Sequence, residues 1–472
     1  MSQKYHIAST YLLFCVLLQF EASTISADTT KAQTVAFVET PLRNLGPVLP
    51  GVDPYSVHIS KDGTRAAYVQ NGFGSSSIVL NGIVTKFYDN IDKSSLSMDD
   101  QGETSFIATE RGRSFVVTNG VDGRSYDSVD DLRFTDDGHT LYRATNGKKQ
   151  CYAIDGKEQG WYDSVREGWF YSSANVIVFI GRQHAKDRVF FNGSAKRRFD
   201  NVEFMSVSSD MQHVAFVAKN RSDILSSLVI DNKVIYKAAF IGAPEFSPTD
   251  SVVATTSEGT KSAYVVDGQV LKAYDSVDGI TFDSSGQHYA YTATLGSEKF
   301  VVRDGVESPK HYLGVSWPHF IGGGSNDAYF ASATNSMDYN NLVVNGVEQD
   351  VPGTTSNGYG YPLFTHDGTH YVYECYTTDT PRKSVLVVDG IVSSMYDSMF
   401  GCWFIGRAGD TICEAWTFPP TAPGKPNIYA VVDGVQSPIY DHIWWPTSDR
   451  VAAPNYFYGL HGIQIYRVDV KY

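Results

Sequence analysis

Charged residues are scarce in this chain of 472 residues, and the basic ones are the scarcer. Only 19% of the residues are charged, with 38 Lys and Arg against 52 Asp and Glu, so the net charge is −14. A protein that binds phosphate backbones needs a basic stripe, and an anionic membrane surface attracts basic segments. We therefore expect no nucleic-acid partner and no binding to an anionic membrane.

Long apolar runs are also missing, apart from one near the N-terminus. Tyr11 to Phe20 is an apolar run of about ten residues, too short to span a bilayer. Lys4 precedes it, and the small residues Ser23 to Ala27 follow. This order predicts a secretory signal peptide over residues 1–27, cleaved near Ala27. We expect a secreted or periplasmic protein with no stable membrane insertion.

Cysteine is rare, with five in the chain, one of which (Cys15) lies in the predicted leader. The other four, Cys151, Cys375, Cys402 and Cys413, are too few to form a disulfide framework and lack the spacing of a zinc site. Cys402 and Cys413 flank a predicted hairpin, so a disulfide between them is one interpretation. Buried free thiols are the other.

Motifs of known catalytic machinery are absent. The chain has no Gly-x-Ser-x-Gly elbow, no His-Glu-x-x-His and no glycine loop that would hold a phosphate. His366 and His370 flank one turn without a third ligand, and we interpret them as exposed turn residues. We expect no cofactor and no metal, and we assign no catalytic residue.

The abundant feature is a repeat of about 37 residues in a chain rich in aromatic residues (13%). Its clearest copy has a Val-Val-Asp-Gly run, then Tyr274-Asp-Ser-Val277, a Phe-Asp-Ser-Ser-Gly run ending at Gly286, and Tyr289-Ala-Tyr-Thr292. Asp-Gly or Asn-Gly between two β-branched runs predicts a tight hairpin, because both turn residues need a positive φ. These hairpins fall at Asn81-Gly82, Asn119-Gly120, Asp155-Gly156, Asn192-Gly193, Asp267-Gly268, Asp304-Gly305, Asn345-Gly346, Asp389-Gly390 and Asp433-Gly434, with Asp231-Asn232 in the remaining slot.

A second turn lies half a repeat away, so each repeat holds four short antiparallel strands, a to d, as a propeller blade does. The sequence thus predicts an all-β propeller. The chain holds eleven candidate first strands, which begin near Val57, Leu96, Leu132, Trp169, Met205, Glu245, Ile280, His319, Pro362, Trp403 and Ile443.

Eleven blades exceed the usual four to eight, which favours two rings, formed by residues 28–240 and 241–472. The Tyr-Asp element is lost at this boundary, in Tyr236 to Phe240. The period nevertheless runs through it without a linker, so one large ring is the alternative. Thr34 to Val38 is a spare strand that we expect to complete the last blade and close a ring.

Two stretches carry a family resemblance. Phe134-Thr-Asp-Asp-Gly138, and Phe246-Ser-Pro248 shortly before Asp250, resemble the Phe/Trp-Ser-Pro-Asp-Gly signature of the WD40-like repeats of TolB-type propellers. The resemblance covers nearly all of the mature chain at the level of fold. It implies a propeller that binds other molecules, and it transfers no partner and no catalytic residue.

An aspartate recurs after Tyr or Phe in most repeats. Because catalysis needs one asymmetric site, we interpret these carboxylates as acceptors for backbone amides in the turn between strands d and a. They are Asp89, Asp127, Asp163, Asp200, Asp275, Asp397 and Asp441.

The repeat is broken mainly in repeats eight to ten, at residues 351–361, 377–383 and 417–426. These loops share one face of a propeller, and irregular loops on a regular scaffold commonly bind ligands. Aromatic residues near them are the candidate binding residues, with packing between blades as the alternative for the tryptophans. The candidates are Tyr359, Tyr361, Trp416, Phe418, Trp444 and Trp445.

Our first functional hypothesis is an exported, non-enzymatic scaffold that binds a protein or a glycan through this long-loop face. The alternative is a glycan hydrolase or lyase with two carboxylates at the mouth of a central channel, and a surface-layer role is a third, weaker one. The hypotheses leave the ligand and the oligomeric state open. The carboxylates for the enzyme would come from Glu374, Asp379, Asp410 and Glu414.

Two glycosylation sequons, Asn192-Gly-Ser194 and Asn220-Arg-Ser222, matter only if the source glycosylates such sites.

Overall fold

The structure is a computed structural model in which Gln33–Tyr472 form one compact unit. Residues 1–34 lie outside the described part, and the predicted signal peptide lies with them. The structure describes residues 35–471 except 43–44, 47–51, 53–55, 73, 322–323, 325, 335–337, 357–361, 366, 378–380, 406–409, 419–425, 434 and 446–453. No helix in this described part is long and apolar enough to cross a membrane.

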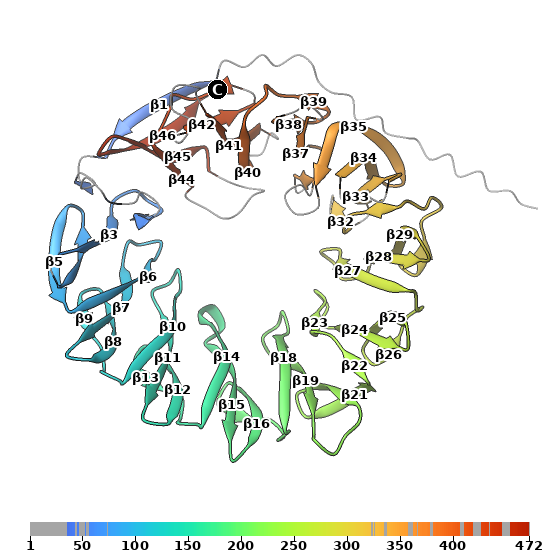
Figure 1. Ribbon diagram of the computed structural model, residues 1–472, viewed down its shortest axis with the longest axis horizontal. Helices are drawn as coiled ribbons and strands as arrows, with labels where there is room; N and C mark the ends of the chain where they lie inside the picture. The colour runs from blue at the N-terminus through green and yellow to red at the C-terminus, as the bar shows by residue number, and fades with distance from the viewer. Residues whose placement is uncertain are drawn as a thin grey trace, which may run out of the picture. The chain divides into compact units, whose positions relative to one another are not determined.

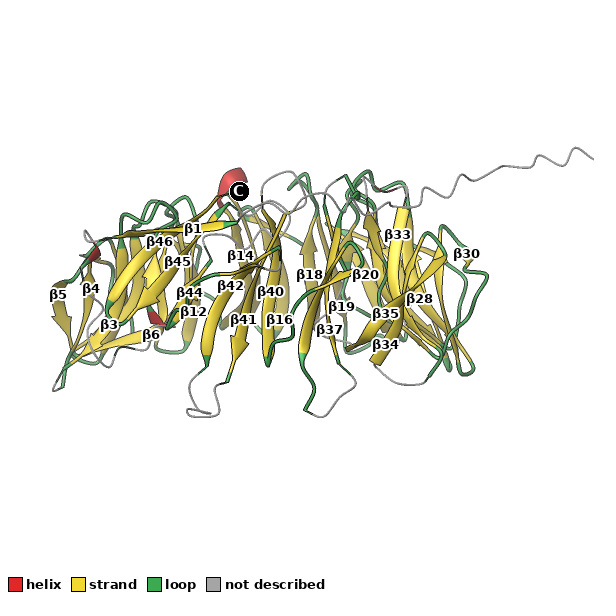
Figure 2. Cartoon of the chain, turned by 90° about the horizontal axis from the view of Figure 1, so that it is seen from above, coloured by secondary structure: helices red, strands yellow, loops and turns green. Residues whose placement is uncertain are grey.

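This unit is a β-propeller of eleven blades in one ring (Figure 1). The strands run between the two faces of the ring, as the edge-on view shows (Figure 2). Each predicted first strand is present and is the innermost strand of its blade.

The first five blades consist of these strands, from the inside outward. Blade 1 has β2 (His58–Ile59), β3 (Ala66–Asn71), β4 (Ser76–Leu80) and β5 (Ile83–Tyr88); blade 2 has β6 (Asn90–Met98), β7 (Thr104–Glu110), β8 (Arg113–Thr118) and β9 (Val121–Asp122); blade 3 has β10 (Ser128–Phe134), β11 (Thr140–Asn146), β12 (Lys149–Ile154) and β13 (Lys157–Glu158); blade 4 has β14 (Ser164–Tyr171), a 3-10 turn η3 (Ser172–Ala174), β15 (Val176–Gln183), β16 (Lys186–Phe191) and β17 (Ser194–Ala195); blade 5 has β18 (Asn201–Val207), β19 (Val214–Lys219), β20 (Ser226–Ile230) and β21 (Lys233–Ala238).

The other six blades follow the same order. Blade 6 has β22 (Phe240–Ile241), β23 (Glu245–Phe246), β24 (Val252–Glu258), β25 (Lys261–Val266) and β26 (Gln269–Val270); blade 7 has β27 (Ser276–Phe282), β28 (Tyr289–Leu295), β29 (Glu298–Arg303) and β30 (Val306–Glu307); blade 8 has β31 (Gly314–Val315), β32 (His319–Ile321), β33 (Asn326–Ser332), β34 (Asp338–Val344) and β35 (Val347–Ser356); blade 9 has β36 (Leu363–Phe364), β37 (Tyr371–Tyr376), β38 (Ser384–Val388) and β39 (Ile391–Val392); blade 10 has β40 (Ser398–Ile405), β41 (Asp410–Thr417), β42 (Asn427–Val432) and β43 (Val435–Gln436); blade 11 has β44 (His442–Trp444), β45 (Tyr456–His461), β46 (Gln464–Lys471) and the N-terminal β1 (Ala36–Pro41).

The preference for two rings is wrong, and the alternative of one large ring is right. At the expected boundary, Val217 and Leu228 of blade 5 pack against Ile241 and Val265 of blade 6 in one buried cluster. This layer resembles the layers between the other neighbouring blades, so loss of the Tyr-Asp element at residue 239 does not interrupt the array.

Strand β1 closes the ring, as predicted. It pairs antiparallel with β46 from Ala36 opposite Lys471 to Pro41 opposite Tyr466, and Figure 1 shows the two strands side by side. The Tyr458 hydroxyl of blade 11 donates a hydrogen bond to the Lys61 carbonyl of blade 1 at 2.7 Å. Blade 11 therefore packs against blade 1, and β1 supplies the outer strand that pairs with the edge of β46.

The hairpin prediction is confirmed by the backbone. In blade 3, Asp155 has φ 46° and Gly156 has φ 78°. The Asp155 carboxylate also accepts the backbone N–H of Thr140, the first residue of strand b, at 2.8 Å. The side chain thus satisfies a strand-end amide that would otherwise lack a partner.

The Tyr-Asp motif joins neighbouring blades. Asp163, after blade 3, pairs with Lys149 of that blade at 2.6 Å and accepts the His184 N–H of blade 4 at 2.9 Å. The Lys149 ammonium and this amide lower the pKa of Asp163. We expected the donor amides to lie in the turn between strands d and a. They lie instead in the b–c turn of the next blade. The equivalent acceptor–donor pairs are Asp89–Arg111, Asp127–Gly147, Asp200–Arg221, Asp275–Gly296, Asp397–Phe418 and Asp441–Gly462.

The motif's tyrosine also reaches the next blade. Tyr274 is 1% exposed in the layer between blades 6 and 7, and its hydroxyl donates to Glu307 of strand d in blade 7 at 2.9 Å. Burying the ring while satisfying the hydroxyl makes tyrosine suited to this position. Tyr88, Tyr126 and Tyr440 reach Asp122, Glu158 and Glu39 in the same way.

Candidate functional site

A group of aromatic side chains surrounds one carboxylate between blades 10 and 11. We call it the aromatic cluster, and it consists of Phe400, Trp403, Trp416, Phe418 and Trp445 around Glu414. The ring centroids of Phe400 and Trp416 lie 4.5 Å apart, those of Trp416 and Phe418 lie 6.3 Å apart, and those of Trp403 and Trp445 are stacked at 4.6 Å. Phe400 and Trp403 lie on β40 and Trp416 on β41, while Phe418 and Trp445 directly follow β41 and β44.

Glu414 fixes the orientation of two indole rings. Its side chain is 9% exposed, and its two oxygens accept the Nε1–H groups of Trp416 at 2.7 Å and Trp445 at 3.1 Å. Burial raises the pKa of Glu414, while the two indole donors act in the opposite direction. Each indole N–H is thus used internally, and the aromatic faces are held in place.

The outer rings of the cluster are open to solvent. Phe400 is 44% exposed and Phe418 is 40% exposed, with Trp416 partly buried between them. Asp397 accepts the Phe418 N–H at 2.6 Å and pairs with Lys383 of blade 9. The repeat's junction aspartate therefore also positions an exposed aromatic residue.

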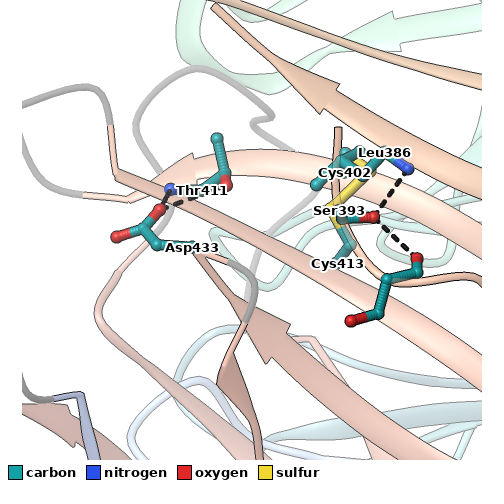
Figure 3. Close-up of a disulfide and its surroundings, with 7 residues drawn as sticks. Leu386, Ser393, Cys402, Thr411, Cys413 and Asp433 are labelled. Carbon is teal, nitrogen blue, oxygen red and sulfur yellow. Dashed lines mark hydrogen bonds between the residues drawn. A yellow bond between two sulfur atoms is a disulfide. The ribbon is translucent and has the colours of Figure 1, made fainter. Parts of the chain in front are cut away.

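A disulfide crosses the hairpin that supports the cluster (Figure 3). Cys402 on β40 lies directly opposite Cys413 on β41, with Cα atoms 4.3 Å apart, and the two are bonded. Thr411 of the same hairpin donates its N–H to Asp433 at 2.7 Å. The cross-link ties together the two strands that carry Phe400 and Trp416.

The other two cysteines in the described part of the chain are thiols. Cys151 and Cys375 are buried, and desolvation raises the pKa of each to about 12. Neither thiol is poised to react as a thiolate at neutral pH.

The predicted binding residues divide into three groups. Trp416, Phe418 and Trp445 lie together in the aromatic cluster. Trp444 turns to the layer facing blade 1, where it packs edge-on to His442 with ring centroids 4.6 Å apart. Tyr359 and Tyr361 lie outside the described residues.

Sequence reasoning missed Phe400 and Trp403 and saw Glu414 only as a catalytic candidate. Phe400 stands three residues after the junction Asp397, where the equivalent residues of blades 3 and 7 are Asp130 and Asp278. Aligning the repeats on the junction aspartate would have shown this change from an acid to an aromatic residue.

The carboxylates of the enzyme alternative do not share a pocket among the described residues. Glu374 shares its side of the strand with Val372, which packs against blade 10, whereas Glu414 shares its side with Ile412, which packs against blade 11. The sheet of blade 10 therefore separates them. Asp410 lies four residues from Glu414 on β41, about 13 Å along an extended strand. Asp379 lies outside the described residues.

Histidines form a repeated contact that the sequence did not suggest. His139 pairs through Nδ1 with Asp155 at 2.8 Å, and His370 pairs with Asp389 at 2.7 Å in the same place of blade 9. His366 lies outside the described residues. Within the described part, no three His, Cys, Asp or Glu side chains group as metal ligands do.

Comparison with known proteins gives distant likenesses among solved structures. No protein-family model matches the chain, and no curated protein matches it. Among solved structures, TolB from Acinetobacter baumannii is 15% identical with a TM-score of 0.23, over 44% of this chain and 62% of TolB. An oligogalacturonate lyase in complex with manganese is 11% identical with a TM-score of 0.30, over 61% of this chain and 93% of that one.

The Dos1 propeller is also 11% identical with a TM-score of 0.30, over 59% of this chain and 88% of its own. This chain covers less than two thirds of the TolB structure. The ring of four-stranded blades itself confirms the TolB-type resemblance at the level of the propeller fold. Likenesses as distant as these carry no argument about fold or function.

Proposed function

We propose that this protein is an exported, non-enzymatic scaffold that binds a protein or a glycan through the aromatic cluster of blades 10 and 11. The observation that carries the proposal is the Glu414 carboxylate, which holds two indole rings beside two solvent-exposed phenylalanines. Rings fixed before binding lose little conformational entropy when a ligand stacks on them.

The chemistry of the cluster suits an apolar or flat ligand face. Phe400 and Phe418 expose ring surface without a polar group to satisfy, so burying them gains the hydrophobic contribution at little desolvation cost. The CH-rich face of a sugar or an aliphatic side chain of a protein meets this requirement. Export rests on the predicted leader, which places the ligand in the extracellular or periplasmic space.

The test is binding by the full mature chain with Phe400→Ala and Phe418→Ala in one variant. Both side chains are about half exposed, so their removal should leave the fold intact. The matched control is Phe87→Ala on β5 of blade 1, where a phenylalanine is 57% exposed outside the cluster. A defined glycan array and an extract of the source's own envelope and medium serve as two separate probes.

A ligand held by the wild type and the Phe87 variant and lost by the double variant supports the proposal. Array binding identifies a glycan, and extract binding that resists glycosidase treatment identifies a protein. A ligand that the double variant still holds at wild-type affinity contradicts the proposed surface.

A further inference from the structure

One of the ten hairpins between strands c and d departs from the others. In nine of them the Asx side chain accepts the backbone N–H at the start of strand b, as Asn81 does from Ala66 at 2.8 Å and Asn119 from Thr104 at 2.9 Å. The other seven acceptors are Asp155, Asp231, Asp267, Asp304, Asn345, Asp389 and Asp433. Asn192, the tenth, makes no such hydrogen bond among the described residues.

The surroundings of Asn192 are open. It has φ 48° at the tip of the hairpin between β16 and β17, and its side chain is exposed. A Cβ added to the neighbouring Gly193 would meet no atom within 4 Å. The same test at Gly268 in blade 6 meets the Ile235 carbonyl at 2.6 Å, so hairpin tips in this ring are not all equally free.

The residue that follows the turn also differs in blade 4. In six of the other nine hairpins it is an exposed apolar residue, such as Val121 and Val306, each 70% exposed, or Ile391, 58% exposed. In blades 3, 5 and 6 it is Lys157, Lys233 and Gln269. Blade 4 has Ser194, which is exposed and completes the sequon Asn192-Gly-Ser. The hairpin in which the Asn side-chain amide makes no hydrogen bond to strand b is therefore also the hairpin that has a serine hydroxyl two residues later, at Ser194.

We propose that Asn192 carries an N-linked glycan, and this inference rests on the export proposed above. The donor is an oligosaccharide linked to a polyprenyl pyrophosphate. A bond forms between Nδ2 of Asn192 and C1 of the first sugar, the bond from C1 to the phosphate oxygen breaks, and polyprenyl pyrophosphate leaves. The amide nitrogen releases one proton to solvent while the departing pyrophosphate gains one negative charge, so atoms and charge balance.

The second sequon is a contrast within the same chain. Asn220 is half-buried, and its Nδ2 donates a hydrogen bond to Asp223 at 3.0 Å. The amide nitrogen to be modified is thus already engaged at Asn220, whereas the exposed Asn192 side chain makes no hydrogen bond among the described residues.

The glycan would leave the binding surface free. The c–d hairpins share a face with the a–b turns, whereas Trp416 and Phe418 lie at the b–c end of their strand, on the other face. Blade 4 is also well separated from blade 10 around the ring (Figure 1). Modification at Asn192 therefore should not alter binding at the aromatic cluster.

The experiment expresses the full chain in a glycosylating eukaryotic secretory host. Secreted wild type is treated with peptide N-glycosidase F in heavy-oxygen water, and the Asn192 peptide is analysed by mass. Ser194→Ala removes the acceptor hydroxyl without touching the strained turn residue, and Ser194→Thr preserves the sequon as the matched control.

We expect conversion of Asn192 to heavy-oxygen aspartate in nearly all wild-type and Ser194→Thr molecules, and in none of the Ser194→Ala molecules. Unmodified Asn192 in secreted wild type overturns the inference, as does a glycan found on Asn220 alone. A second chain with a heterologous leader in place of residues 1–27 keeps the tests apart. If only that chain is exported and glycosylated, the export prediction fails while Asn192 stands as the acceptor.

Discussion

Two arcs of the ring carry different kinds of side chain at one equivalent position of the repeat. We call blades 2–7 the early arc and blades 8–11 the late arc. In the five early-arc blades that follow a junction aspartate, the residue three positions after it is charged, and in blades 10 and 11 of the late arc it is Phe400 and Trp444. Blade 6 has no junction aspartate. The early-arc residues at this position are Asp92, Asp130, Arg166, Glu203 and Asp278.

The charges of the early arc are used within and between blades. Arg143 pairs with Asp130 at 2.5 Å within blade 3, Arg166 with the fully buried Asp187 at 3.0 Å within blade 4, and Asp278 of blade 7 accepts the Trp317 indole of blade 8 at 3.1 Å. The late arc instead packs Phe400 against Trp416 and leaves both side chains partly open to solvent. The repeated residues thus build the ring, while the residues that depart from the repeat form its candidate binding surface.

The largest expected effect tests whether both arcs share one structural core. Tyr274→Ala in the early arc and Tyr396→Ala in the late arc each remove a side chain that is 1% exposed. Each should lower the free energy of unfolding by about 3–5 kcal/mol, as large aromatic-to-alanine changes in cores do. Urea unfolding of both variants measures it. A loss confined to one arc would show that the two arcs are not held by the same contacts.

The next effect belongs to the late arc alone. Replacing Cys402 and Cys413 with serine removes the cross-link within the β40–β41 hairpin, and we expect a loss of about 2–4 kcal/mol. Thermal unfolding under oxidising conditions compares this variant with the wild type. Reducing agent should destabilise the wild type and leave the double serine variant unchanged, and the opposite pattern would exclude a structural role for the bond.

A smaller effect concerns Glu414. In Glu414→Gln the side-chain NH₂ group would face one of the two indole N–H groups, so one hydrogen bond is lost. The free energy of unfolding should fall by about 1–3 kcal/mol near neutral pH. The substitution should also abolish the pH dependence of stability that the Glu414 carboxyl contributes. Because burial raises the folded-state pKa of Glu414 above its ordinary value of 4.5, the folded wild type holds this proton more tightly than the unfolded chain.

The stability advantage of the wild type over Glu414→Gln should therefore fall as pH rises from about 4.5 through the raised pKa, and stay at its lower level above it. Urea unfolding at a series of pH values measures this difference. Glu374 is present in both proteins, so its own raised pKa cancels. A difference that grows with pH would contradict the assigned environment of Glu414.

The smallest effect on stability comes from the junction aspartates. Asp163→Asn and Asp397→Asn each weaken an exposed ion pair and one hydrogen bond to an amide, so thermal unfolding should change little for either. Only Asp397 holds the amide of an exposed aromatic residue, Phe418. Ligand binding should therefore weaken in Asp397→Asn and remain normal in Asp163→Asn, and equal losses would remove the distinction between the arcs.

The fold was predictable because the same turn and strand signals occur in nearly every repeat. Residue pairs such as Asp155-Gly156 and Tyr274-Asp275 recur with fixed spacing, and their local geometry requires hairpins and blade junctions. The number of rings was not predictable from this pattern, because a blade interface such as that around Ile241 is the same in one ring as in two. The spare strand at Val38 foretold the closure, since an eleventh blade lacked its outer strand.

The candidate site was predictable only in part. Trp416 and Phe418 adjoin an irregular loop, and loop irregularity is visible in sequence. The approach of Trp445 to Glu414 depends on how blades 10 and 11 pack. The two residues are far apart in sequence, so no local pattern predicts their contact. Phe400 escaped notice because it stands inside a regular strand, where only comparison with Asp130 and Asp278 shows the change.

The central claim is that binding resides in the late arc, and hydrogen exchange measures it most directly. Backbone exchange of the full chain would be followed by mass spectrometry with and without its captured ligand. The account predicts added protection in residues 398–405 and 410–417, and none in the equivalent early-arc strands 276–282 and 289–295. Protection centred on the early arc, with 398–405 and 410–417 unchanged, would contradict it.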